Sequence, residues 1–226
     1  MKLDRIFIIN LKNRKDRKKQ IIKELHRVKA TNYEFFEAIK PTEQDVSNWC
    51  SKYIDPIPLW FITYKKDPLK YRIGALGCLK SHYEIIKICK QKGYKHVLIL
   101  EDDTKFVFPE NISLDEKFNT LSPQIDHIFN VYGLLYLVGN HNPQFVKQVS
   151  QNLLLTKHTL TTGSYIISEK AMDFILANLN GYNKEIDVFY IERVQQQLPC
   201  FVIHPHITGQ VSSYSDIVQC DVNYNL

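Results

Sequence analysis

The sequence predicts an α/β protein in which one mixed sheet is flanked by helices. Short runs of apolar and β-branched residues alternate along the chain with longer segments whose apolar residues recur at helical spacing. The first unit is a strand-like run at residues 5–10, a polar turn and a helical segment over residues 14–30. A length of 226 residues with a hydrophobic fraction of 44% suits a single domain over residues 1–226.

Each later element is predicted from its local pattern. We expect strands at residues 33–39, 96–100, 128–133, 135–139, 153–156, 164–168 and 200–204. We expect helices over residues 74–93, 169–179 and 186–198, the first of them ended by Gly93. Residues 41–72 contain four prolines and many aromatic residues, which predicts an irregular, partly helical insertion packed over the sheet.

The net charge of +5 is concentrated in one segment. Residues 12–19 (KNRKDRKK) hold six bases and one acid, and the remainder of the chain is nearly neutral. This distribution argues against a nucleic-acid-binding surface and leaves open a local anion site near the N-terminus.

The cysteines and the apolar segments bear on the compartment. Five scattered cysteines without a C-x-x-C pair argue against a disulfide framework or a zinc knuckle and fit a reducing compartment. Lys12 interrupts the apolar run of residues 6–11, so we see no signal peptide, and no segment reaches the roughly 18 apolar residues of a membrane span. The sequence therefore predicts a soluble, cytoplasmic protein.

Three consecutive acids, Glu101, Asp102 and Asp103, follow the predicted strand at residues 96–100. Ligands of open α/β sheets gather at the carboxyl ends of strands. If the extended conformation continues, Glu101 and Asp103 share one side and Asp102 faces away. Two carboxylates on one side predict a site for Mg²⁺ or Mn²⁺, and the alternative is a solvated acidic turn or the first turn of a helix.

Two groups on helical segments are further candidates. Arg14 and Arg17 are three residues apart, so one helical face presents both, either to the phosphates of a nucleotide or simply to solvent. His82 falls near an apolar stripe and fits a packed, hydrogen-bonded histidine. Gly74 and Gly77 suggest a close backbone approach where their helix begins, and a ligand is a candidate for the approaching group.

Candidates in the second half of the chain are more isolated. Asp187 starts a helical pattern, where a carboxylate serves as a cap or as a general base that deprotonates a hydroxyl. The pair His204 and His206 flanks a strand end and offers an imidazole to a metal, but no second Cys/His motif supports it, and a chance pairing is favoured.

Taken in order, the motifs resemble glycosyltransferase family 25 over nearly the whole chain. The matching blocks are IFIINLKNRKDRKKQI, FFEAI, IGALGCLKSHYEI (Gly-x-x-Gly-Cys-x-x-Ser-His), HVLILEDD (Leu-Glu-Asp-Asp), TGSYIISEKAM, EIDVFY and QVSSYSDI (Ser-Asp-Ile). The order of the blocks is more specific than any one of them.

The resemblance implies a GT-A type, Rossmann-like fold that binds a nucleotide-sugar and uses a divalent metal. It implies transfer of a hexose, such as galactose or glucose, from a UDP-sugar with inversion to a glycan, lipooligosaccharide or hydroxylated protein. Carried over by motif, Glu101 and Asp103 are the ligands of the metal (Mn²⁺ or Mg²⁺), Asp102 contacts the ribose, and Asp187 is the general base. The resemblance assigns the remaining donor contacts to Asn10, Arg14, Arg17, Ser81, His82, Gln210, Ser215 and Asp216.

One departure from the family pattern keeps two rivals open. Many relatives carry a glutamate where this chain has Ala75, so any role of that acid is in doubt. The rivals are a metal-dependent nucleotidyl- or phosphotransferase and a non-catalytic relative that binds a carbohydrate or a partner. The aromatic residues of the insertion (Trp49, Tyr53, Trp60, Phe61 and Tyr64) suit an acceptor platform less well than packing against the sheet.

Overall fold

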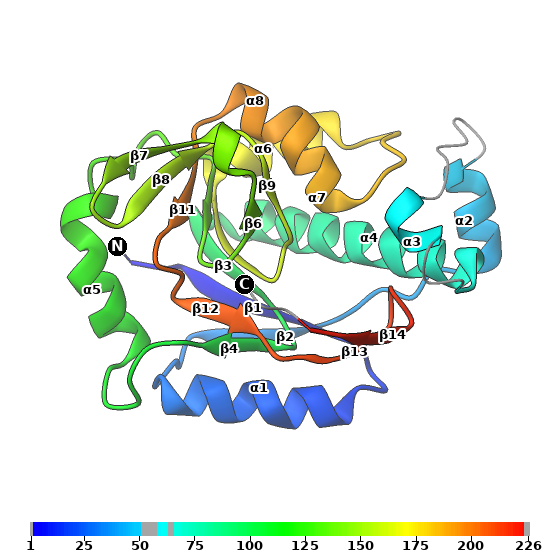
Figure 1. Ribbon diagram of the computed structural model, residues 1–226, viewed down its shortest axis with the longest axis horizontal. Coiled ribbons are helices and arrows are strands. Elements are labelled where there is room, and N and C mark those ends of the chain that lie inside the picture. Colours follow the sequence, from blue (N-terminus) through cyan, green and yellow to red (C-terminus); the bar gives the residue numbers. More distant parts are fainter. Residues whose placement is uncertain (1, 51–57, 63–65, 224–226) are drawn as a thin grey trace.

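The computed structural model describes residues 2–50, 58–62 and 66–223. Its centre is a sheet that lies between helices (Figure 1). The sheet is mixed and eight-stranded, with strand order β2-β1-β3-β10-β5-β11-β8-β7. Helices cover both faces of the sheet, so the predicted α/β class is confirmed. The sheet strands are β1 (Arg5–Asn10), β2 (Tyr33–Glu37), β3 (His96–Glu101), β5 (Leu134–Tyr136), β7 (Val146–Ser150), β8 (Leu153–Thr156), β10 (Ser164–Ser168) and β11 (Cys200–Ile203).

Most strands of the sheet share one direction. β1 pairs in parallel with β2 and β3, and β11 pairs in parallel with β5. β10 lies between β3 and β5 and is antiparallel to both. The carboxyl ends of β1, β2, β3, β5 and β11 therefore lie along the same edge of the sheet, where ligands of α/β proteins bind.

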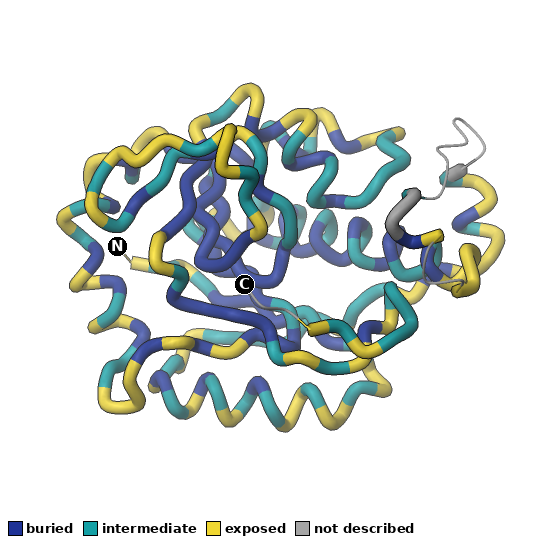
Figure 2. The backbone as a smooth tube through the Cα atoms, in the orientation of Figure 1, coloured by how far each residue is buried: buried dark blue, intermediate teal, exposed yellow. Residues whose placement is uncertain are grey.

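The helices form two layers. The helices are α1 (Lys15–Arg27), α2 (Glu43–Cys50), α3 (Leu59–Ile62), α4 (Pro68–Lys92), α5 (Leu114–Ile125), α6 (Glu169–Asn178), α7 (Ile186–Phe189) and α8 (Gln195–Gln197), with a π-helical turn, η2, at Tyr190–Val194 between the last two. Apolar residues of α1 and α5 pack on one face of the sheet. Residues of α4, α6, α7 and η2 pack on the other. The strands between these layers are buried (Figure 2).

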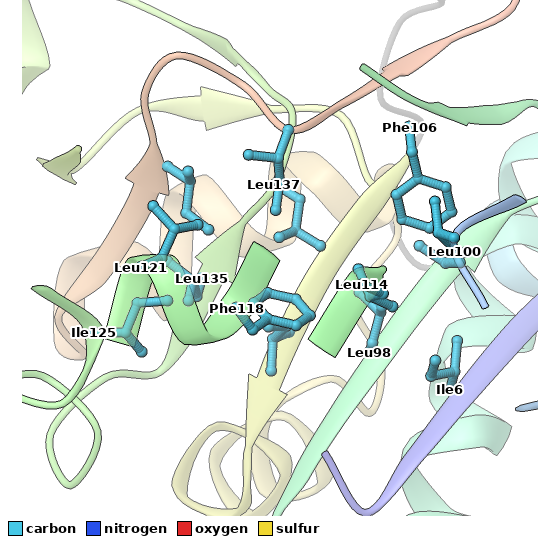
Figure 3. Packing of buried hydrophobic residues seen from close by; sticks show 14 of the residues in the cluster. Ile6, Leu98, Leu100, Phe106, Leu114, Phe118, Leu121, Ile125, Leu135 and Leu137 are labelled. Carbon is cyan, nitrogen blue, oxygen red and sulfur yellow. The ribbon is translucent and has the colours of Figure 1, made fainter. Parts of the chain in front are cut away.

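Strand alternation decides which residue enters which core. On β3, Leu98 and Leu100 join the core under α5, where Phe118 also packs (Figure 3), and Val97 and Ile99 join the core under α4. Burial of a side chain such as Phe118 contributes about 1.5–3 kcal/mol. The next odd-numbered residue on β3, Glu101, is therefore directed to the α4 face.

Short strand pairs lie outside the main sheet. β4 (Thr104–Phe106) pairs with β12 (Thr208–Gln210), β6 (Asn140–His141) with β9 (Thr159–Leu160), and β13 (Ser213–Ser215) with β14 (Cys220–Val222). The β4–β12 pair brings the C-terminal segment to the acidic turn. A 3₁₀ turn, η1, occupies Pro143–Phe145.

One predicted strand is wrong. Residues 128–131 form turns, with Val131 N and Tyr132 N both bonded to the Ile128 carbonyl at 2.9 Å. Ile128 and Tyr132 are buried together beneath α5, so their four-residue spacing was a helical signal rather than a strand signal.

Other bounds shift. α4 begins at Pro68, where Asp67 caps it by accepting from Leu69 N at 2.9 Å. Gly74 and Gly77 therefore lie inside α4 and not at its start. The close approach is real but is made to protein, because a Cβ on Gly77 would lie 2.6 Å from the Ile39 carbonyl oxygen.

The insertion at residues 41–72 is partly helical, as predicted. It contains α2, α3 and the first residues of α4. Phe61 is buried and Trp49 Nε1 donates to the Tyr182 carbonyl at 2.8 Å, so these aromatic residues pack. Tyr53, Tyr64 and the Trp60 side chain lie outside the described residues.

The described helices include none that is long and apolar enough to cross a membrane. Cys78, Cys89, Cys200 and Cys220 are free thiols.

Candidate active site

Glu101 ends β3 and faces α4. Its carboxylate accepts a hydrogen bond from Thr162 Oγ1 at 2.8 Å and lies 4.0 Å from His82 Nε2. Burial, followed by the neighbouring Asp103 charge, raises the pKa of Glu101 to about 8. Of the described residues, Cys78, His82 and Glu101 are the group whose potential ligand atoms all lie within 4.8 Å of one another.

His82 is held rigidly on α4. Its ring is fully buried, and Nδ1 shares a 2.7 Å hydrogen bond with Tyr165 OH, which is 2.9 Å from Tyr190 OH. Burial lowers the pKa of His82 to about 3, so the ring is neutral. Nε2 is buried and has no hydrogen-bond partner within the described structure, and it faces the Glu101 carboxylate.

The guanidinium of Arg17 forms ion pairs with the other two acids, Asp102 and Asp103. Arg17 Nη1 lies 2.9 Å from Asp102 Oδ1 and 3.1 Å from Asp103 Oδ2. Asn10 Nδ2 donates to Asp102 Oδ2 at 2.7 Å. The expected alternation is thus wrong beyond Glu101, because β3 ends there and the turn lets one arginine contact both aspartates.

The C-terminal segment closes over this turn. Gln210 Nε2 lies 3.3 Å from Asp103 Oδ1, and Val211 N donates to the Asp103 carbonyl at 2.8 Å. Gly163 makes room for Gln210, since a Cβ at Gly163 would lie 2.9 Å from Gln210 Cδ. Burial raises the pKa of Asp103, while Arg17 opposes that shift.

Arg14 fastens the same segment from α1. It contacts Asp216 Oδ2 at 2.6 Å and the Tyr214 carbonyl at 3.3 Å. Ser215 Oγ accepts from Val218 N at 3.2 Å and so shapes the following turn. In this structure Arg14, Ser215 and Asp216 lie beside the acidic turn, and their hydrogen bonds are made within the protein.

Asp187 lies at the start of α7. Its carboxylate accepts from Val188 N at 2.9 Å and from Thr161 N at 3.3 Å. Burial raises its pKa, and the Glu185 charge adds to the shift. Thr161 holds a left-handed φ of 76°, which a β-branched residue rarely adopts.

The loop of residues 161–163 therefore joins two acids. Thr161 bonds to Asp187 and the next residue, Thr162, bonds to Glu101. Two carboxyl groups with raised pKa values are thus held by consecutive residues.

Ser81 is engaged within the fold. Its hydroxyl donates to the Gly77 carbonyl at 2.7 Å and accepts from Ile39 N at 2.9 Å. These bonds tie α4 to the segment that follows β2. Contact of Ser81 with a nucleotide-sugar donor stays a prediction, which rests on its position next to His82.

Cys78 and the two threonines were missed in the sequence. Cys78 precedes His82 by four residues, a spacing that places both on one helix face and was available as a signal. Thr161 and Thr162 carry no comparable signal, because their contacts span 26 and 61 residues.

The side chains around Glu101 can be tested for their suitability as ligands of a divalent cation. Burial raises the pKa of the Cys78 thiol well above its usual range, and a thiol must lose its proton to bind a metal. The unpartnered His82 Nε2 and the carboxylates of Glu101 and Asp103 remain. An imidazole beside carboxylates fits Mn²⁺ better than Mg²⁺, which takes oxygen ligands.

A mixed sheet with acids and bases gathered at the carboxyl ends of its parallel strands defines the class of α/β proteins that bind ligands along that edge. Within that class, a family model described as "Glycosyltransferase family 25 (LPS biosynthesis protein)" matches residues 3–190. The chain belongs to glycosyltransferase family 25.

Curated relatives carry the same family's names. Procollagen galactosyltransferase 2 of Homo sapiens is 28% identical over 242 aligned residues, covering 96% of this chain and 37% of the relative. A glycosyltransferase 25 family member of Drosophila melanogaster is 33% identical over 109 residues, covering 47% of this chain and 17% of the relative. The chain thus spans well under half of the length of these relatives.

Solved structures resemble the fold at low identity. A UDP-glucose pyrophosphorylase complexed with UDP-glucose is 8% identical, with 89% of this chain and 90% of that chain covered and a TM-score of 0.47. A197 from STIV is 9% identical, with coverages of 97% and 93% and a TM-score of 0.45. At these values neither structure informs the role of a residue.

Proposed function

We propose that this protein is a glycosyltransferase that moves a hexose, such as galactose or glucose, from a UDP-sugar to an acceptor hydroxyl with inversion. The observation that carries the proposal is the pairing of Glu101 and Asp187 through Thr162 and Thr161, in a chain that belongs to glycosyltransferase family 25. The acceptor is a glycan, a lipooligosaccharide or a hydroxylated protein.

The transfer needs a base on one side of the sugar and charge stabilisation on the other. Asp187 takes the proton of the acceptor hydroxyl, whose oxygen forms a bond to the anomeric carbon. The bond from that carbon to the diphosphate oxygen breaks, and UDP departs with the electron pair. Attack from the face opposite UDP inverts the configuration at the anomeric carbon.

The raised pKa of Asp187 supports its role as the base. A carboxylate with an ordinary pKa near 3.9 is a weak base at neutral pH, and burial brings it closer to the working pH. Its two backbone donors, Thr161 N and Val188 N, fix the direction of the carboxylate.

The acidic turn would receive the diphosphate. Glu101, Asp103 and His82 would hold Mn²⁺ (or Mg²⁺), which supplies Lewis-acid stabilisation of the departing diphosphate. Arg14 and Arg17 lie on the α1 side of this turn, where their charges favour phosphate. Asn10 and Asp102 would contact the nucleoside, and Gln210 would keep Asp103 in place.

We expect Asp103→Asn to abolish sugar transfer while the fold is retained. Transfer from UDP-galactose and UDP-glucose is measured with Mn²⁺ over a glycan and hydroxylysine-peptide panel, and folding is checked by circular dichroism. Asp115→Asn, on the exposed first turn of α5, is the control and retains activity. Full turnover in Asp103→Asn contradicts the assigned role.

Donor binding separates the proposal from its rivals. Thermal unfolding is measured with UDP-sugars plus Mn²⁺ and, separately, with nucleoside triphosphates plus Mn²⁺. Stabilisation by UDP-sugars supports the proposal. Stabilisation by triphosphates alone indicates a nucleotidyl- or phosphotransferase, and stabilisation by neither indicates a relative without donor binding.

A further inference from the structure

Three histidines from distant segments gather at the carboxyl edge of the sheet, away from the acids. His141 ends β6, and His204 and His206 follow β11. The ring centres of His141 lie 6.2 Å from His204 and 5.7 Å from His206, and the latter two are 6.1 Å apart. The three rings meet edge to face, at interplanar angles of 87–89°.

Two of these rings hold a buried nitrogen without a partner. His141 Nδ1 and His206 Nε2 are buried and make no hydrogen bond within the described part of the chain. Buried polar atoms are almost always satisfied, so each exception calls for a partner that the protein itself does not supply. Burial and the two neighbouring imidazoles lower the pKa of His206 to about 4, which leaves its ring neutral and its lone pair available.

We propose that His141, His204 and His206 form a binding site for a borderline divalent transition-metal cation of the Zn²⁺ type. With a metal–nitrogen bond of about 2.1 Å and a ring radius of about 1.1 Å, three imidazoles in a tetrahedral site have centres about 5.2 Å apart. The separations of 5.7, 6.1 and 6.2 Å are within about 1 Å of that value. Ring rotation completes the site, because in the present rotamers the three ligand atoms do not all come within 4.8 Å of one another.

The ligand set distinguishes this site from the acidic one. It consists of imidazoles, which suit Zn²⁺, Ni²⁺ and Cu²⁺, whereas the carboxylates of Glu101 and Asp103 suit Mn²⁺ and Mg²⁺. β11 lies three strands from β3 in the sheet, which separates the carboxyl ends of these two strands by about 14 Å. A bound cation would fasten the β6–β9 pair to the segment between β11 and β12, and the fourth position would remain for water or another oxygen ligand.

Metal binding is tested on the full chain in a Cys78→Ser background, which removes the thiol of the Cys78, His82 and Glu101 group. Zn²⁺ affinity and stoichiometry are measured by competition with a chromophoric chelator, and Co²⁺ is added separately for its visible spectrum. We expect a tight site that persists in Glu101→Gln, with a tetrahedral Co²⁺ spectrum that lacks thiolate charge-transfer bands. His141→Gln and His206→Gln should each weaken Zn²⁺ binding by at least about tenfold, the lower end of the loss caused by removing an outer-shell partner.

The controls decide between this site and a general affinity of histidines. His127→Gln changes an exposed histidine in the turn after α5 and should leave the Zn²⁺ affinity unchanged. The Glu101→Gln variant should also keep the tight site. Absence of a tight Zn²⁺ site, or a site lost in Glu101→Gln but retained in His206→Gln, overturns the proposal. Because the readout is metal binding alone, failure here is independent of any result on sugar transfer.

Discussion

Glu101 is an acid whose surroundings favour its protonated form. The strand that ends at Glu101 carries the carboxylate into the α4 layer, where burial and the Asp103 charge raise its pKa to about 8. Its surroundings favour a neutral carboxyl in the free protein. A cation bound with the donor would favour the ionised carboxylate instead. The protonation of Glu101 is therefore coupled to folding and, in the proposed function, to metal binding.

The pH dependence of stability follows from that pKa. Between the ordinary value of about 4.3 and a folded value of about 8, the unfolded chain binds fewer protons at this position than the folded chain does. Stability therefore falls as pH rises through this window, and the favourable contribution is fully present only below about pH 4.3.

We expect Glu101→Gln to remove this fall. With a chelator present to remove divalent cations, the free energy of unfolding of the variant should be higher than that of the wild type by roughly 2–4 kcal/mol near pH 8. The difference should vanish toward pH 4.5. Urea unfolding followed by tryptophan fluorescence provides the measurement, with Glu110→Gln at an exposed position as the control. A pH-independent difference between variant and wild type would contradict the assignment.

At the scale of elements, a buried polar chain fixes His82. It passes from His82 on α4 through Tyr165 on β10 to Tyr190 in the π-helical turn. A π turn inside a helix is uncommon and often marks a functional site. Here it carries the tyrosine that ends the chain of hydrogen bonds.

A second tyrosine–histidine pair offers a matched comparison. Tyr132 OH bonds to His96 Nδ1 at 2.7 Å, the same distance as in the Tyr165–His82 pair. His96 begins β3 and Glu101 ends it, so the two pairs lie at opposite edges of the sheet.

We expect Tyr165→Phe and Tyr132→Phe to destabilise the fold by similar amounts, about 1–3 kcal/mol, since each leaves a histidine nitrogen without its partner. Only Tyr165→Phe should reduce donor turnover, because only His82 faces Glu101. Urea unfolding and steady-state kinetics are compared for the two variants. Equal kinetic effects would show that the polar chain has a structural role alone.

Some elements were predictable and some were not. Residues 97–100, 164–168 and 200–203 are buried on both faces, so their mostly apolar sequence marks them as strands. The β4 and β12 strands have three residues each and no such run, and they exist because they pair with each other. The local sequence pattern therefore predicts strands that are buried in the core, and it misses short strands that form only by pairing with each other.

At the scale of the whole molecule, Arg17 connects parts of the chain that are far apart in sequence. It contacts Asp102 and Asp103, 85 and 86 residues later, and donates to Ser213 Oγ at 2.8 Å. The acid triplet could be found in the sequence, but its counter-charge could not, because these separations leave no local signal. The same holds for His141, which the fold brings to His204 and His206.

We expect Arg17→Gln to destabilise the metal-free protein by roughly 3–5 kcal/mol, since two largely buried carboxylates lose their counter-charge. Mn²⁺ should stabilise this variant more than it stabilises the wild type, because the cation then neutralises the acids without competing with a guanidinium. Thermal unfolding with and without Mn²⁺ tests this.

Arg14→Gln, at the N-cap of the same helix, is the matched control. Arg14 contacts Asp16 and Asp216 rather than the acidic turn. Its Mn²⁺-dependent shift should equal that of the wild type. Equal shifts in all three proteins would place the cation away from Asp102 and Asp103.

The reversed strand β10 also sets the order in which the protein can be completed during synthesis. β3 leaves the ribosome with β1 and β2, but its other neighbour, residues 164–168, is made about 60 residues later, several seconds at about 5–20 residues per second. Until then β3 has an open edge, and Arg17 still lacks Ser213, which follows later again. The nascent chain therefore exposes an unpaired strand edge beside an acidic turn that lacks part of its hydrogen bonding. A translational pause between residues 101 and 164 would prolong this exposure, and with it the period in which chaperones bind such edges.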